Sequence, residues 1–133
     1  MSMTKPISRP RTWGFRFLLT DAIVIAIVVL SALFLKHFDN PLWWLLLIVA
    51  GHFFLFCNVF RERRRFEFVW AGFFIVNAGV WLLFENLVLT NVIAFQLPIT
   101  LACVISEMRS PYYHGICASR MNRRLNDYLE CRI

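Results

Sequence analysis

Four long apolar runs, separated by short charged segments, constrain the fold of this chain more than any other feature. The runs cover about residues 15–35, 41–60, 68–84 and 87–106. At about 1.5 Å per residue, a helix made by the first run is about 31 Å long, close to the thickness of the hydrocarbon core of a bilayer. The 133 residues are also 59% apolar, which is more than a soluble domain of this size can bury. The sequence therefore predicts an all-α membrane protein with four transmembrane helices.

Positive charge is concentrated between and outside these runs. Thirteen of the fourteen Lys and Arg residues lie near the N-terminus, in the link at 61–65 or in the tail after residue 106, and Lys36 is the exception. If the four runs cross a bilayer, all thirteen lie on the same side, which the positive-inside rule assigns to the cytoplasm. We therefore predict that both termini face the cytoplasm from the cell inner membrane. Anionic phospholipid, not nucleic acid, is the expected counter-charge.

This topology divides the chain into three parts. They are a cytoplasmic N-terminal segment (residues 1–14), a four-helix transmembrane domain (residues 15–106) and a cytoplasmic tail (residues 107–133). Apolar tail residues recur at helical spacing beside arginines, which is typical of a short amphipathic helix lying on the membrane surface: Met121, Leu125, Tyr128 and Leu129. The alternative is a solvated terminal helix that packs on nothing.

The link between the second and third runs is short and highly charged. Arg63 with Glu67, and Glu62 with Arg65, have the spacing of ion pairs within one helix. Arginines of this link and of the tail are also candidate contacts to lipid headgroups, although a charge run at a helix end can be a topology signal alone. These candidates are Arg61, Arg63, Arg64, Arg65, Arg120, Arg123 and Arg124.

Polar side chains inside the predicted spans are costly to place in lipid, so each is a candidate for function. They are Asp21, His52, Asn58, Asn77 and Gln96. Asp21 is interpreted either as a structural carboxylate near Asn58 and Arg61 or as a proton or cation site. His52, Asn77 and Gln96 are expected at one depth, where they would lock the helices through hydrogen bonds or line a polar path beside a fourth helix broken at Pro98.

Cofactor and metal sites have little support in the sequence. A haem held by two histidines needs a second histidine at the depth of His52, and no other histidine is expected there, so no cofactor is predicted. Axial ligation of a pigment or haem by His52 alone stays open as a third functional reading. The spacing of His114, Cys117 and Cys131 is not that of a zinc module, so no metal site is predicted.

Enzymatic activity is not expected, because the chain has no nucleophile with a nearby base, no glycine-rich phosphate loop and no paired carboxylates. The first hypothesis is a non-enzymatic accessory or assembly subunit of a larger membrane complex, with a membrane-protein partner or a second copy beside it. The alternative is a small proton-coupled transporter or channel that uses Asp21 and the layer of His52, Asn77 and Gln96.

Overall fold

The computed structural model describes residues 11–133, and this part of the chain contains no strand. Lys5 and Arg9 of the predicted basic N-terminal segment lie outside the described residues. Helix makes up 69% of the structure, which confirms the all-helical prediction. The elements are α1 (Leu19–His37), α2 (Trp43–Phe54), the π-helical turn η1 (Leu55–Val59), α3 (Arg64–Leu83), α4 (Leu89–Met108), α5 (Ala118–Met121) and α6 (Leu125–Leu129).

Three helices are long and apolar enough to cross a membrane: α1 with 19 residues, and α3 and α4 with 20 each. The stretch predicted at 41–60 is shorter than these, because α2 has 12 residues and η1 adds five. It starts late because the side-chain oxygen of Asn40 accepts the N–H of Leu42 at 3.0 Å and holds residues 41–42 in a turn. A break of the fourth helix at Pro98 was also expected, but α4 continues through this residue.

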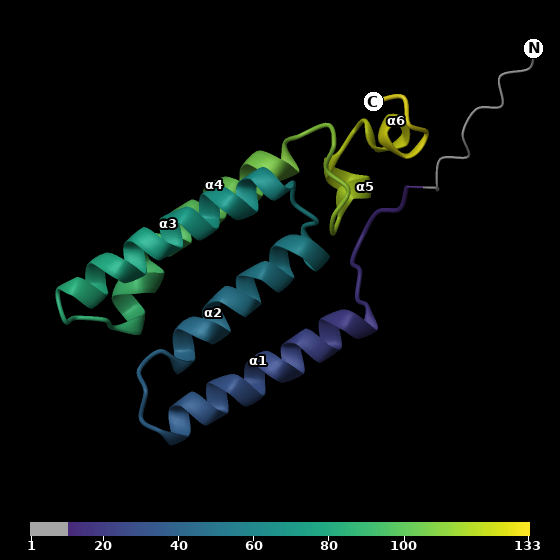
Figure 1. The fold of residues 1–133 in the computed structure, drawn as a ribbon. Helices are drawn as coiled ribbons and strands as arrows, with labels where there is room; N and C mark the ends of the chain where they lie inside the picture. Colours follow the sequence, from purple (N-terminus) through teal and green to yellow (C-terminus); the bar gives the residue numbers. More distant parts are fainter. Residues whose placement is uncertain (1–10) are drawn as a thin grey trace, which may run out of the picture.

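The long helices form two hairpins, α1 with α2 and α3 with α4 (Figure 1). A residue with positive φ lies in the turn of each hairpin, Asp39 in the first and Glu85 in the second, and Arg61 has positive φ in the link between hairpins. Because each hairpin reverses the direction of the chain, residues 11–18, this link and the tail meet at one end of the molecule (Figure 1).

Polar contacts hold the second hairpin together. The indole N–H of Trp70 on α3 donates to the hydroxyl of Thr100 on α4 at 2.9 Å. The side-chain amide of Asn77 donates to the carbonyl of Val92 at the same distance. Phe56 of η1 packs edge-to-face against Trp70 in the buried core, so the first hairpin contacts the second through α2 and η1.

The tail does not form the single amphipathic helix that the sequence predicted. Asn122 adopts an extended conformation between α5 and α6. Its side-chain N–H groups donate to the carbonyls of Pro111 and Tyr113 at 2.8 and 2.7 Å, and its side-chain oxygen accepts the N–H of Arg124. These three bonds replace the helical ladder at this point, so two short helices form in place of one.

The folded tail packs on the rest of the chain. Leu125 is buried against Tyr113, and the N–H of Ile116 donates to the carbonyl of Val59 at 2.9 Å. Gly115 lies directly against the backbone of Phe60. The tail thereby closes the end of the molecule at which the two hairpins are linked.

Candidate functional site

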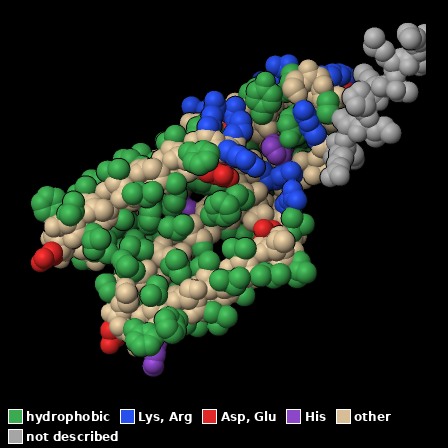
Figure 2. Space-filling model, viewed as in Figure 1, with side chains coloured by type: hydrophobic (Ala, Val, Ile, Leu, Met, Phe, Trp, Pro, Cys, Tyr) green, Lys and Arg blue, Asp and Glu red, His purple; other side chains and the backbone are tan. Residues whose placement is uncertain are grey.

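The basic side chains gather at the end of the molecule closed by the tail (Figure 2). A cavity of about 760 Å³ lies there between α2, the link, the start of α3 and the tail. Its charged and titratable lining consists of Arg16, Cys57, Arg61, Glu62, Arg63, Arg64, Glu67 and His114. We refer to it as the basic cavity.

Glu62 is the buried acid of the basic cavity. Its side chain is 7% exposed, and both carboxylate oxygens lack a hydrogen-bond partner among the described residues. Burial, followed by the negative charges of Glu107 and Glu67, raises the pKa of Glu62 to about 8. At neutral pH this side chain is therefore mostly protonated and uncharged.

Glu107 is buried completely and forms an ion pair with Arg63. The Nε of Arg63 lies 2.9 Å from one carboxylate oxygen of Glu107, and the other oxygen has no partner within residues 11–133. The predicted pairs within the link, Arg63 with Glu67 and Glu62 with Arg65, do not form. Arg63 lies just before α3 with extended backbone, so its side chain reaches α4, while Glu67 accepts a hydrogen bond from the Cys57 thiol.

The tail contributes one ring side chain, His114, to the wall of the cavity. His114 stacks on Tyr128 with ring centroids 4.7 Å apart. Burial, with a smaller effect from the charge of Arg61, lowers the pKa of His114, so the imidazole is neutral at neutral pH. Burial also raises the pKa of Tyr113 to about 12, and its hydroxyl donates to the carbonyl of Ile116 at 2.7 Å.

The seven arginines that were predicted to contact lipid headgroups lie in different places in the structure. Arg61, Arg63 and Arg64 line the basic cavity together with Arg16, which the sequence reasoning did not select. The guanidinium of Arg65 lies outside this cavity, over the Phe66 ring. The remaining three, Arg120, Arg123 and Arg124, belong to the tail. Of these, Arg123 and Arg124 line a separate cavity of about 230 Å³.

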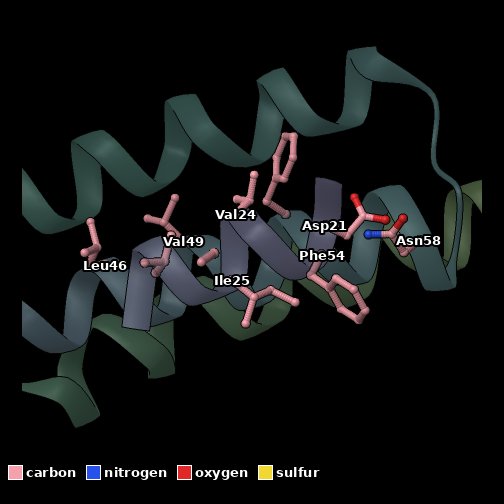
Figure 3. Close-up of a pocket in the computed structure, with 10 residues that line it drawn as sticks. Asp21, Val24, Ile25, Leu46, Val49, Phe54 and Asn58 are labelled. Carbon is pink, nitrogen blue, oxygen red and sulfur yellow. The ribbon is translucent and has the colours of Figure 1, made fainter. Parts of the chain in front are cut away.

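Asp21 lies in the first turn of α1, because this helix begins at Leu19 and not near residue 15. One carboxylate oxygen accepts the N–H of Leu18 at 2.7 Å, so Asp21 caps its own helix. Its side chain faces that of Asn58 across the mouth of a groove of about 250 Å³ between α1 and α2 (Figure 3). Both interpretations of Asp21, as a structural carboxylate and as a proton or cation site, stay predictions.

The three polar residues of the predicted layer do not all line the same cavity. His52 and Gln96 line one small cavity of about 90 Å³ between α2 and α4, whereas the amide of Asn77 is engaged by Val92 inside the second hairpin. The Gln96 amide N–H donates to the carbonyl of Trp70 at 3.3 Å, and in the described part of the chain the Gln96 side-chain oxygen has no partner.

His52 is held from two sides. Its Nδ1 lies 3.0 Å from the carbonyl of Ile48, and its ring stacks on Trp70 with centroids 4.5 Å apart. The adjoining cavity of about 90 Å³ is well below the roughly 300 Å³ at which pockets for small molecules begin. In the described part of the chain, no group of three or more His, Cys, Asp or Glu could hold a metal ion.

Sequence reasoning missed the buried acids of this site. Glu62 is a single acid within a run of arginines, and Glu107 directly follows the fourth apolar run. An acid at such a position can be solvated at a helix end or buried, and the local sequence is the same in both cases. Its position at the end of a predicted span was the available signal.

Comparison with known proteins finds no matching family model, no similar curated protein and no similar solved structure.

The raised pKa of Glu62 makes stability depend on pH. Below its ordinary pKa of 4.5 the carboxyl is protonated in both the folded and the unfolded chain. Between pH 4.5 and about 8 the unfolded chain loses this proton while the folded chain keeps it, so stability falls across this window. We expect a loss of a few kcal/mol, at about 1.4 kcal/mol for each tenfold change in proton affinity.

Thermal unfolding in detergent, followed by tryptophan fluorescence, tests this expectation. Glu62→Gln should unfold at the same temperature as the unchanged protein at pH 4.5 and at a higher temperature at pH 8. Parallel pH curves for the two proteins would show that Glu62 ionises normally in the folded state.

Proposed function

We propose that this protein is an integral membrane protein with four spans and cytoplasmic termini. It acts without catalysis as an accessory or assembly subunit of a larger complex in the cell inner membrane. The orientation is supported by the gathering of basic side chains at the end where residues 11–18, the link and the tail meet (Figures 1 and 2). The positive-inside rule places such an end in the cytoplasm.

The short second span is compatible with this topology. Together, α2 and η1 have 12 and 5 residues, which corresponds to about 25 Å of helix. A hydrocarbon core of about 30 Å accommodates such a difference by local thinning and by long basic side chains that reach the headgroups. The arginines at 61–65 directly follow this span and can serve that purpose.

The free face of α1 is the observation that carries the proposed function. This helix packs against α2, and Ala32 is its one buried residue. On the face turned away from α2, five large apolar side chains recur every three or four residues and are 51 to 78% exposed: Leu19, Ile23, Ile27, Leu30 and Phe34. This spacing is typical of a seam between two packed helices, so we propose that a helix of the partner protein packs here.

Site-specific photo-crosslinking in cells tests the proposal. A photoreactive residue at Leu30, on the free face of α1, should give one adduct of defined mass with a different membrane protein. The same residue at Ile75 of α3 is the matched control, since Leu30 is 66% and Ile75 70% exposed. It should give no protein adduct.

Three results would contradict the proposal. They are adducts of equal yield at both positions, no protein adduct at Leu30, and an adduct with the mass of two copies of this chain. The last result would identify a homo-oligomer and not an accessory subunit.

A further inference from the structure

Unpaired positive charge is the main property of the basic cavity. Four guanidinium groups line it: Arg16, Arg61, Arg63 and Arg64. Glu107 neutralises Arg63, and Arg61 donates to the carbonyl of Thr12 at 2.8 Å. Among the described residues, no carboxylate lies within ion-pair distance of Arg16 or Arg64.

The acids in the wall do not cancel this charge. Glu62 is mostly protonated at neutral pH, so Glu67 is the one lining carboxylate left to oppose the arginines. The titratable groups that interact with Glu62 are Glu107 and Cys103 from α4, Glu67 from α3 and Tyr113 from the tail. Neither oxygen of Glu62 has a hydrogen-bond partner among the described residues. The cavity is therefore suited to an anion.

An apolar groove adjoins the basic cavity. It is the groove of about 250 Å³ between α1 and α2, whose walls are apolar except for Asp21 and Asn58 at its mouth (Figure 3). Phe53 lines both the groove and the basic cavity, so the two spaces share a wall. The groove runs along the helices, in the direction that an acyl chain takes in a bilayer.

We propose that the basic cavity and the groove together bind one anionic phospholipid, with its phosphate among Arg16, Arg61 and Arg64 and an acyl chain between α1 and α2. Guanidinium groups match the geometry of phosphate oxygens and bind them through paired N–H groups. The cavity lies at the ends of the membrane helices, where headgroups are found. The groove distinguishes a lipid from free phosphate, which has no apolar part to occupy it. This proposal is independent of the partner proposed for the outward face of α1.

Lipid retention by the full-length protein tests the proposal. The protein in neutral detergent is titrated with phosphatidylglycerol, with phosphatidylcholine or with inorganic phosphate, and bound lipid is counted by native mass spectrometry. One phosphatidylglycerol should be retained in preference to phosphatidylcholine, and millimolar phosphate should not displace it. Equal retention of both lipids would overturn the anionic preference, and displacement by phosphate alone would overturn the lipid assignment.

Two charge variants locate the phosphate. Arg16→Gln/Arg64→Gln removes the two arginines that have no acidic partner, and should weaken binding of phosphatidylglycerol about tenfold or more. Arg65→Gln/Arg120→Gln removes the same charge from residues outside the cavity, and should bind within about twofold of the unchanged protein. Equal losses in the two variants would mean that only the overall charge matters, and would overturn the site.

A second pair of variants tests the groove. Val49→Phe fills the groove beside the basic cavity and should weaken phosphatidylglycerol binding severalfold. Leu47→Phe adds a ring of the same type on the opposite side of the contact between α1 and α2, in a second groove of about 230 Å³, and should leave binding unchanged. Unaltered binding by Val49→Phe would overturn the placement of the acyl chain. Unfolding temperatures of all four variants, measured without lipid, separate loss of binding from loss of folding.

Discussion

Replacing Arg63 with glutamine is expected to lower the free energy of unfolding by about 3 kcal/mol. The reason is that Glu107 is completely buried, and the Nε of Arg63 at 2.9 Å is the cation that balances it. Without Arg63 the folded protein must bury the carboxylate of Glu107 with no cation to balance it. A reversible denaturation curve in mixed micelles measures this loss.

Two controls separate the ion pair from a general effect of charge. Arg64→Gln removes an exposed arginine next in sequence, and should change the free energy of unfolding by less than about 0.5 kcal/mol. In the double variant Arg63→Gln/Glu107→Gln the buried charge is absent, so most of the lost stability should return. A double variant no more stable than Arg63→Gln would indicate that Arg63 acts through packing on the rings of Phe66 and Tyr112, not through the charge of Glu107.

Replacing Gly115 with alanine is expected to detach the tail from the rest of the protein, at a cost of about 2 to 3 kcal/mol. A Cβ at this position would lie 2.7 Å from the carbonyl carbon of Phe60 and 2.8 Å from its Cα. Both are backbone atoms of the link, so a side-chain rotation cannot relieve the contact. The neighbouring bond from Ile116 to the carbonyl of Val59 should break as well.

Limited trypsin cleavage measures this detachment at the tail arginines. Because cleavage requires local opening, Gly115→Ala should raise the rate after Arg120 and Arg123 by about thirtyfold. Gly79→Ala is the matched control, since a Cβ there meets no atom within 4 Å. It should leave the cleavage rate unchanged and, within α3, should be neutral or slightly stabilising. Equal cleavage rates in the two variants would contradict the steric argument for Gly115.

Several features of the fold are predictable from short windows of sequence. Apolar content over about twenty residues is a local property, and it predicted the helices now seen as α1, α3 and α4. The boundaries are less predictable because single polar contacts set them. The side chain of Asn40 delays the start of α2, and Asn122 divides the tail into two helices through bonds to Pro111 and Tyr113.

The candidate site shows the same division between local and distant information. Asn58 was proposed as a neighbour of Asp21 because both were expected near the inner ends of adjacent spans, and they do face one another (Figure 3). Arg63 was instead assigned to Glu67, which has favourable helical spacing. It pairs with Glu107, 44 residues away, because the link is extended at Arg63 and brings its side chain to the end of α4.

The sequence alone determined that this chain is helical, with apolar segments of membrane-spanning length and positive charge confined between and beyond them. Hydropathy and charge are properties of each segment, so they do not depend on how the segments pack. Only the tertiary structure decided which charges are buried, which are paired and which share a cavity. Burial of Glu62, pairing of Glu107 and close contact of Gly115 with Phe60 all arise where distant segments meet.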